Sequence, residues 1–462
     1  MPPSILFALP LIVAATFVPA YDTQAGLPAD DLPRPTPVQL AWQRAELGVV
    51  FHYDLHVFDD GHYVQSKNRR TPPGDPNRFA PTELDVGQWV RTARAMGARF
   101  AILTASHETG FRLWQSDVNP YCLRAVEWGG GERDLVAEFV RECRAQDIAP
   151  GIYLGTRWNA QLGVLDFRVT ERSPVTQAEY NALIEAEVEE ICSRYGPLFE
   201  LWFDGGAFGP DQGGPDVLSV VERLQPDCVF YHNHDRADAR WGGSESGTVP
   251  YPCWATLPFQ GYVRFNEELA RDGFRLLRTG DPDGDVWCPA MSDAPVRNHE
   301  WFWDEGDDDK VRDASELVDM YYRSVGHNST LILGLTPDDR GLMPRRDVEV
   351  CEAFGAAIAD AFARPAGHVA GTGDEVVLRL DGPRAIDHIV VQETIAEGER
   401  VRAYEIDVRE DGAWRTLATG TCIGHKRIHR FDRRTVDAVR LRVLAARAEP
   451  RIERLEAFRA GD

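Results

Sequence analysis

Short apolar runs alternate with amphipathic helical patterns along the first three quarters of the chain. Two helical patterns are clear, because apolar side chains recur at intervals of three and four within residues 135–143 and 183–195. The second pattern begins at the capping-box signature Thr176-x-x-Glu179 and ends at Gly196. Strands that alternate with helices predict a parallel sheet. The predicted strands are the runs 49–51, 100–104, 151–154, 198–203, 228–231, 254–257, 286–289 and 331–335.

This pattern belongs to the α/β class, and eight runs of this kind predict a (β/α)8, TIM-like barrel. The main alternative is an open, doubly wound sheet. That fold is disfavoured because no Gly-x-Gly-x-x-Gly motif follows the first run. We therefore expect the barrel to occupy residues 30–363.

The pattern changes after Pro365. Residues 364–374 are rich in glycine and are predicted to be a linker. Beyond them, apolar and polar residues alternate with a period of two, and no helical pattern intervenes, which predicts a small all-β sandwich domain over residues 375–462. The candidate strands are 376–380, 386–392, 403–409, 413–419, 426–431, 438–444 and 451–458.

The first twenty residues carry no charged side chain, and an apolar run extends from Ile5 to Val18. This run is too short to span a membrane. Val18-Pro19-Ala20 has the small residues that a signal peptidase prefers, although a basic start is missing. We expect residues 1–20 to be a signal peptide and the mature protein to be secreted or periplasmic.

The composition restricts the partners. A net charge of -23 disfavours nucleic acids and anionic membranes and suits a neutral ligand. Twelve Trp and thirteen Tyr fit a protein that stacks on sugar rings, although a large core also collects aromatic residues. The eight Cys contain no Cys-x-x-Cys pair, which excludes an obvious zinc ribbon or redox motif. Buried free thiols are expected, with disulfides left open.

Polar groups follow several of the predicted strands. His52, His107-Glu108, Arg157-Trp158 and Asp204 each come directly after a run, and Glu245 lies in a Gly- and Ser-rich stretch further on. The carboxyl ends of barrel strands share one mouth, so these groups are expected to converge. Two carboxyl groups among His and Trp match the needs of glycoside hydrolysis.

Simpler interpretations remain for each group. Asp204 could cap the next helix, and the aromatic residues from Trp301 to Trp303 could be core. The histidines could bind a metal, but no His-Glu-x-x-His or facial-triad spacing is present, so no metal site is predicted. The histidines considered were His52, His56, His62, His107, His232 and His234.

An ordered set of motifs spans the chain from about Trp42 to Phe362. The motifs are Phe51-His52, Ala101-Ile-Leu-Thr-x-x-His107-x-x-Gly110-Phe-x-Leu-Trp114, Leu201-Trp-Phe-Asp204-Gly-Gly206, Gly243-x-Glu245-x-Gly247, Trp287-x-Pro-Ala-x-x-Asp293, Trp301-Phe302-Trp303 and Leu331-x-Leu-x-x-x-Pro337-Asp-x-x-Gly341. In this set the chain resembles the α-L-fucosidases of glycoside hydrolase family twenty-nine.

The resemblance implies a retaining exo-α-L-fucosidase that acts on glycans with a terminal α-L-fucosyl residue and needs no cofactor. Asp204 would be the nucleophile and Glu245 the general acid/base. The resemblance further implies that the fucose hydroxyls would be bound by histidines and acids and its ring by tryptophans. These substrate-binding candidates are His52, Asp60, His107, Glu108, Trp158 and Trp301.

Two departures from the family pattern affect sugar recognition. The family commonly has Lys-His-His-Asp-Gly-Phe after the second strand, where in this chain either Glu108 replaces one of the paired histidines or the pair is shifted. An acidic residue of the first loop is matched only by Asp59 or Asp60. These changes leave open an α-L-galactosidase, another α-L-glycosidase, or a carbohydrate-binding protein without activity.

The carboxy-terminal segment resembles the discoidin-like β-sandwich that often follows such enzymes. The strand patterns that carry this resemblance are Ile386-Asp-His-Ile-Val-Val-Gln-Glu393 and Gly398-x-Arg-Val-x-x-Tyr404. The domain would either bind carbohydrate or support the barrel, since a fold alone does not determine function. The sequence leaves the oligomeric state open.

Overall fold

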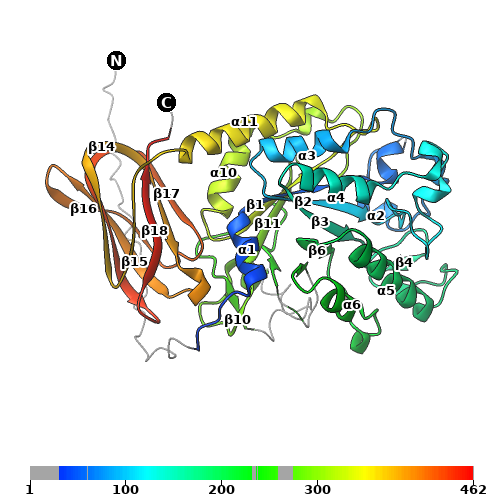
Figure 1. Cartoon of the computed structure of the whole chain (residues 1–462), viewed down its shortest axis with the longest axis horizontal. Helices are drawn as coiled ribbons and strands as arrows, with labels where there is room; N and C mark the ends of the chain where they lie inside the picture. Colours follow the sequence, from blue (N-terminus) through cyan, green and yellow to red (C-terminus); the bar gives the residue numbers. More distant parts are fainter. Residues whose placement is uncertain (1–30, 60, 232–235, 237, 259–273, 461–462) are drawn as a thin grey trace, which may run out of the picture.

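A computed structural model of the chain describes residues 31–59, 61–231, 236, 238–258 and 274–460. The predicted signal peptide and Asp60 lie outside these residues. The chain forms a helix-covered barrel and, beside it, an all-β domain, with the long helix α11 leading from one to the other (Figure 1). Within the described residues, no helix combines the length and apolar character that a membrane crossing needs.

The barrel sheet has eight strands, all paired in parallel, in the order β7-β6-β3-β2-β1-β12-β11-β8. The expected TIM-like architecture is therefore confirmed. The core strand β1 is buried at every position, as predicted for a parallel strand covered on both faces. The strands are β1 (Leu47–Phe51), β2 (Phe100–Ser106), β3 (Ala149–Leu154), β6 (Glu200–Phe203), β7 (Val229–Tyr231), β8 (Arg240–Trp241), β11 (Ala290–Pro295) and β12 (Thr330–Leu335).

Two of the predicted barrel strands are wrong. The runs 254–257 and 286–289 contain β9 (Thr256–Leu257) and β10 (Val286–Trp287), which pair with each other in a separate antiparallel sheet. Their neighbourhood is apolar because Ala255 and Trp287 pack against Ile395 of the β domain. The sixth and seventh barrel strands are β8 and β11 instead. β8 is too short, and β11 too polar, to stand out as an apolar run.

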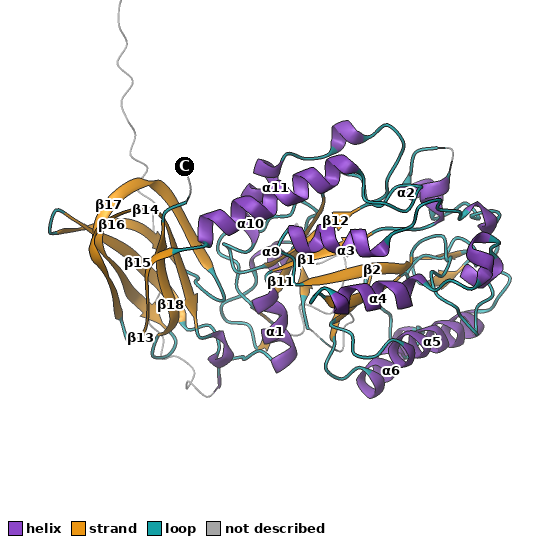
Figure 2. Cartoon of the chain, turned by 45° about the horizontal axis from the view of Figure 1, so that its top comes forward, coloured by secondary structure: helices purple, strands orange, loops and turns teal. Residues whose placement is uncertain are grey.

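Helices cover the outside of the barrel (Figure 2). The two predicted helices are confirmed, and Thr176 and Glu179 form the expected capping box at the start of α5. Gly196 follows α5 with a φ of +70°, a conformation that favours glycine. The helices are α1 (Pro37–Ala45), α2 (Gln65–Asn68), α3 (Val86–Ala95), α4 (Leu135–Ala145), α5 (Gln177–Arg194), α6 (Val217–Leu224), α9 (Arg275–Thr279), α10 (Ala314–Ser324) and α11 (Arg345–Phe362), and short 3-10 turns include η2 (Leu55–Phe58).

The carboxy-terminal domain is entirely antiparallel, with the strand order β13-β18-β14-β17-β15-β16. The predicted linker 364–374 is wrong, because most of it forms β13, which pairs with β18. The seven predicted strands become five, since two pairs of them are continuous in β14 and β17, and β13 is a sixth strand that was not predicted. The strands are β13 (Pro365–Thr372), β14 (Glu375–Glu393), β15 (Val401–Glu410), β16 (Ala413–Gly420), β17 (Arg427–Ala446) and β18 (Arg451–Phe458).

The long strands β14 and β17 build the two layers of this domain. The first half of β14 pairs with the second half of β17, which also pairs with β15. The second half of β14 pairs with β18. Register shifts between Arg379 and Arg384 lie where β14 passes from one layer to the other. Side chains of both halves share one hydrophobic core, as expected of a sandwich.

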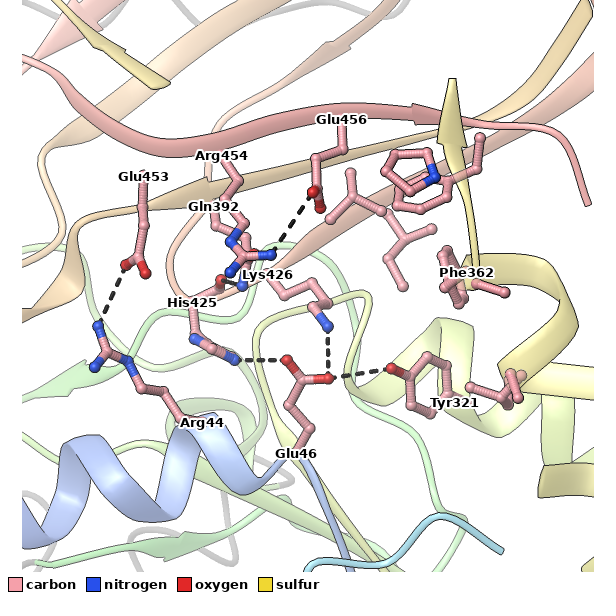
Figure 3. A pocket seen from close by; sticks show the side chains of 17 residues that line it. Arg44, Glu46, Tyr321, Phe362, Gln392, His425, Lys426, Glu453, Arg454 and Glu456 are labelled. Carbon is pink, nitrogen blue, oxygen red and sulfur yellow. Dashed lines mark hydrogen bonds and ion pairs between the residues drawn. The ribbon is translucent and has the colours of Figure 1, made fainter. Parts of the chain in front are cut away.

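A cavity of about 950 Å³ lies between the β domain and the amino end of the barrel, lined by α10, α11, β14, β17 and β18 (Figure 3). Glu46, directly before β1, points into it. Its carboxylate accepts hydrogen bonds from Tyr321 Oη (3.1 Å), His425 Nε2 (2.9 Å) and Lys426 Nζ (2.5 Å). Glu46 therefore ties the two domains together at the end of the barrel opposite the mouth.

All eight cysteines are buried and unpaired. The expectation of buried free thiols is confirmed, and the structure contains no disulfide among these residues.

Candidate active site

Asp204 stands at the carboxyl end of β6, where the buried strand ends and the mouth of the barrel begins. Gly205 and Gly206 follow with φ values of +67° and +90°. A β-carbon at Gly205 would lie 2.6 Å from Cδ of Arg157, so a larger residue would displace that side chain. The glycines turn the chain sharply and leave Asp204 at the mouth beside Arg157.

The groups around Asp204 have opposite effects on the pKa of its carboxyl group. Burial raises the pKa of its carboxyl group, while the positive charges of Arg69 and Arg157 favour the ionised form. The side chains of Tyr153 and Trp202 act in the same direction as the arginines. Asp204 is thus a partly desolvated carboxylate whose ionised form depends on neighbouring cations.

Glu245 lies on an exposed loop that follows β8, and both ends of this loop are bound to β11. The amide of Gly242 donates to the carbonyl of Met291 (2.7 Å), and the amide of Gly247 donates to the carbonyl of Asp293 (2.8 Å). Trp301 Nε1 donates to Glu245 Oε2 at 3.0 Å. The loop is short and anchored, and it holds an accessible carboxyl group over the mouth.

Asp293 of β11 is a third carboxyl group of the mouth. It is buried, and Trp241 Nε1 donates to its Oδ1 at 2.9 Å. Burial, with the negative charges of Glu245 and Asp204, raises its pKa well above the usual range. The charges of Asp204 and Glu245 thus both disfavour the ionised form of Asp293.

Aromatic rings and two histidines form one wall of the mouth. The ring centroid of His52 lies 4.9 Å from Trp301 and 5.6 Å from His107, and His107 stacks on Tyr153 at 5.3 Å. Burial lowers the pKa of His52 to about 3 and that of His107 well below its usual range. Both imidazoles are therefore neutral, and each has one donor and one acceptor nitrogen for a hydroxyl group.

Glu108 and Trp158 are joined by Arg69. Arg69 Nε donates to Glu108 Oε1 at 2.5 Å, and its guanidinium carbon lies 3.4 Å from the centre of the Trp158 ring. Tyr63 Oη donates to the other oxygen of Glu108 at 2.9 Å. Burial raises the pKa of Glu108, and the charge of Arg69 opposes this shift. Glu108 is a fixed acceptor rather than a mobile acid.

Direct contacts join His52 to His107 and to Trp301, and Trp301 to Glu245, while Arg69 joins Glu108 to Trp158. Asp60, and the candidates His232 and His234, lie outside the described residues. No sequence motif predicts a role for Arg69, Tyr63 or Asp293. Asp293 lies in the motif Trp287-x-Pro-Ala-x-x-Asp293, but the predicted strand 286–289 ends before it, whereas β11 contains it. Arg69 and Tyr63 lie in the loop region after β1, which carried no periodic signal.

Three buried side chains near the mouth have the donor atoms of a metal site. One atom each from Asp54, His56 and His107 lies within 4.8 Å of the others, and Nε2 of His56 and Nδ1 of His107 have no hydrogen-bond partner. No such spacing was visible in the sequence because His107 comes from a different strand. Both oxygens of Asp54 accept from the Thr109 hydroxyl (2.7 and 2.8 Å), so the protein already satisfies this carboxylate.

The arrangement combines an ionisable carboxylate, an exposed carboxyl group on a second loop, and neutral hydroxyl-binding groups between aromatic rings. This set is suited to bond cleavage at a sugar carbon. A family model for Alpha-L-fucosidase matches residues 36–359. The chain belongs to the alpha-L-fucosidase family.

This family member is accordingly a glycoside hydrolase. Its sequence is 28% identical to Alpha-L-fucosidase 1 of Arabidopsis thaliana, over 87% of this chain and 83% of that protein. It is also 31% identical to a protein of Oryza sativa subsp. japonica provisionally named alpha-L-fucosidase 1, over 97% and 89% of the two chains.

Solved structures agree with the family assignment. A crystal structure from Bacteroides thetaiotaomicron VPI-5482, provisionally named an alpha-L-fucosidase, matches with a TM-score of 0.90 and 46% identity over 93% of this chain and all of that one. A glycoside hydrolase 29 family member from a rumen bacterium matches with a TM-score of 0.79 and 29% identity over 93% and 78% of the two chains. Both matches include most of the carboxy-terminal domain as well as the barrel.

Proposed function

We propose that this protein is a retaining exo-α-L-fucosidase that removes terminal α-L-fucosyl residues from glycans. The observation that supports this most directly is the common exposure of Asp293 to the charges of Asp204 and Glu245. It supports an approach of these two carboxyl groups, from different loops, to one sugar in the mouth. A retaining mechanism requires these groups to lie about 5 to 5.5 Å apart across the bound sugar.

In the first step, an Asp204 oxygen attacks the anomeric carbon of the fucosyl ring. The bond to the glycosidic oxygen breaks, and this oxygen takes its electron pair together with the proton of Glu245. The products are a covalent glycosyl-enzyme ester and the free aglycone alcohol. The exposed position of Glu245 suits this role because the leaving group must pass out of the mouth.

In the second step, the Glu245 carboxylate removes a proton from a water molecule. The water oxygen attacks the anomeric carbon from the face that the aglycone has left, and the bond to Asp204 breaks. Two inversions give fucose with its original anomeric configuration. The hydrogen bond from Trp301 to Glu245 orients the carboxyl group for both steps.

We assign recognition of the sugar to the walls of the mouth. The neutral histidines His52 and His107 bind hydroxyl groups, and Trp301 and Trp158 cover apolar faces of the ring. Glu108, fixed by Arg69, accepts from a further hydroxyl group. Asp60 keeps its place in this proposal on the sequence resemblance alone.

One observation favours a second candidate substrate, an α-L-galactoside. Glu108 replaces a histidine of the family pattern and is held in a charged cluster with Arg69 and Tyr63. L-Galactose has the stereochemistry of L-fucose but carries a hydroxyl group at C6. A charged acceptor at this wall would bind that additional hydroxyl group.

The test is hydrolysis of an aryl α-L-fucoside and the matching α-L-galactoside, followed by NMR. We expect faster hydrolysis of the fucoside and the α-anomer as the first product. A β-anomer would exclude the retaining mechanism, and faster hydrolysis of the galactoside would change the substrate. If neither compound is hydrolysed, a carbohydrate-binding role without activity replaces this proposal.

We also propose that the protein is exported, on the basis of residues 1–20 alone. The amino-terminal sequence of the protein recovered from its natural host checks this, and a mature chain that still begins at Met1 would contradict it.

A further inference from the structure

Asp54, His56 and His107 bring three donor groups together near the mouth. One donor atom of each residue lies within 4.8 Å of the other two. A point between three such atoms lies about 2.8 Å or less from each of them, whereas Zn–N and Zn–O bonds are about 2.0 to 2.2 Å long. Small movements of the side chains would therefore close the three atoms around one ion.

Each histidine of this group has an unpaired ring nitrogen. Nε2 of His56 and Nδ1 of His107 have no hydrogen-bond partner, although the two residues are only 5% and 6% exposed. A buried polar atom without a partner is costly, and a ligand that binds it removes this cost. If Nδ1 of His107 binds a metal, its Nε2 is still available for a sugar hydroxyl group.

Asp54 supplies the carboxylate of the group. It is 1% exposed, and its donors are the Thr109 hydroxyl group and the Leu55 amide (2.6 Å). Both donors are neutral, and a buried carboxylate with neutral donors gains from a nearby cation. These bonds hold Asp54 in place, but the Thr109 hydroxyl group has only one proton for two oxygens. The carboxylate therefore keeps acceptor capacity for an ion.

Neighbouring side chains hold both histidine rings. The Asn68 amide lies 2.8 Å from Nδ1 of His56. When this amide turns its oxygen toward Nδ1, it accepts the ring proton and leaves the lone pair of Nε2 for a metal. The His107 ring stacks on Tyr153, and its centroid lies 4.9 Å from that of Phe302. Metal-bound histidines characteristically have such a partner at the second ring nitrogen, as Asn68 provides for His56.

We propose that Asp54, His56 and His107 bind one divalent transition metal ion, for which Zn²⁺ is the best fit. Two imidazole nitrogens and one carboxylate oxygen are a donor set that zinc takes in proteins, with a fourth position left open. Mg²⁺ and Ca²⁺ prefer sites made of oxygen atoms. The ion would fix the His107 proton on Nε2, where it can be donated to a hydroxyl group. The site is additional to the proposed hydrolase function and does not depend on it.

The experiment is calorimetric titration of the metal-stripped full chain with Zn²⁺, and with Co²⁺ as a spectroscopic probe. We expect one strong site per chain, Co²⁺ absorption typical of nitrogen and oxygen ligands, and a higher melting temperature with Zn²⁺. Asp54→Asn and His56→Gln should each weaken Zn²⁺ binding about tenfold or more. His62→Gln, at a 74% exposed histidine of the same loop, is the matched control and should bind Zn²⁺ as the wild type does.

Asn68 provides a test with two opposite outcomes. Asn68→Leu removes the partner of His56 and should weaken Zn²⁺ binding about 10- to 100-fold. Asn68→Asp places a carboxylate beside Nδ1 of His56, which makes the imidazole a stronger ligand and should tighten binding. Both variants leave all three ligands in place, so they decide the question even if Asp54→Asn or His56→Gln fails to fold. Thermal unfolding without metal shows whether each variant is folded.

The absence of a strong site in the wild type would overturn the inference. Zn²⁺ affinity that is the same in the wild type, in the folded ligand variants and in both Asn68 variants would overturn it as well. All eight cysteines are buried thiols, and a thiolate charge-transfer band in the Co²⁺ spectrum would assign the ion to cysteine instead. Because every readout is binding or stability, a failure of the proposed hydrolase activity is measured separately.

Discussion

Asp204 and Glu46 lie at opposite ends of the barrel, at the carboxyl end of β6 and before the amino end of β1. Both are partly buried carboxyl groups beside cationic side chains. Burial alone would raise the pKa of Glu46, but the Lys426 ammonium and the His425 hydrogen bond outweigh it, and its pKa falls below the usual range. At Asp204, burial prevails over the arginines and the pKa is raised.

The difference follows from how many donors each carboxylate has. Glu46 accepts hydrogen bonds from three side chains, which Figure 3 shows converging on it. At Asp204, the groups that favour the ionised form are Arg69, Arg157, Tyr153 and Trp202, and together they do not outweigh burial. A carboxylate that joins two domains is stabilised when hydrogen-bond donors occupy both of its oxygens. A nucleophile, by contrast, must keep one oxygen free to react. The structure thus separates the two roles by coordination rather than by residue type.

The largest expected effect is on catalysis at the mouth. Asp204→Asn removes the attacking oxygen and should lower kcat about 10,000-fold or more, as losses of catalytic groups commonly do. The melting temperature should stay within a few degrees of the wild type, because Asp204 has no saturated contacts to lose. Steady-state kinetics on the aryl fucoside and a thermal melt decide this; retained turnover would contradict the nucleophile assignment.

The next effect concerns Glu245. Glu245→Gln should lower kcat/KM about 100- to 10,000-fold for substrates with a poor leaving group, because proton donation is lost. The loss should be smaller for a nitrophenyl leaving group, which departs without a proton. Glu305→Gln, at an exposed acid of a neighbouring loop, is the matched control. Equal losses for both kinds of substrate would remove Glu245 from the acid/base role.

At the other end of the barrel, Glu46→Ala should affect stability instead. It leaves His425 and Lys426 without their shared acceptor, and we expect a loss of about 3 kcal/mol in the free energy of unfolding. The value of kcat should remain within about twofold of the wild type, because the mouth is not touched. Denaturant unfolding and steady-state kinetics on the same preparation measure both quantities. A fall in kcat without a loss of stability would contradict the separate roles of Glu46 and Asp204.

The smallest effect is expected at a second acid of the domain interface. Glu399 accepts from the Ala255 amide (3.0 Å) and from Asn328 (2.5 Å). Burial, with the charge of Glu393, raises the pKa of Glu399 to about 7. The folded protein therefore binds more protons than the unfolded chain between about pH 4.5 and pH 7, and stability from this group falls as pH rises through that window.

Glu399→Gln should remove this slope, because an amide does not ionise. The free energy of unfolding of the variant, relative to the wild type, should be higher at about pH 8 than at about pH 5. Denaturant unfolding at both pH values measures it. A relative stability that does not change with pH would mean that Glu399 ionises in the folded protein as it does in the unfolded chain.

The sequence predicted most of the barrel, because burial on both faces leaves a readable apolar run in strands such as β1 and β6. It failed at β8 and β11 for the same reason, since a two-residue strand and one that carries Asp293 do not form such a run. In the β domain, the period of two located the strands but not their continuity through β14 and β17. Where a strand bends, it passes from one layer of the sandwich to the other, but apolar and polar residues continue to alternate along it.

The chain alone therefore determined where strands end, and with them the positions of Asp204, His52 and His107. It did not determine which distant groups surround these residues. The pairing of Arg69 with Glu108, the hydrogen bond from Trp241 to Asp293, and the three donors around Glu46 arise only when separate segments meet. Local patterns report how deeply a side chain is buried, whereas its charge state depends on partners that tertiary packing brings to it.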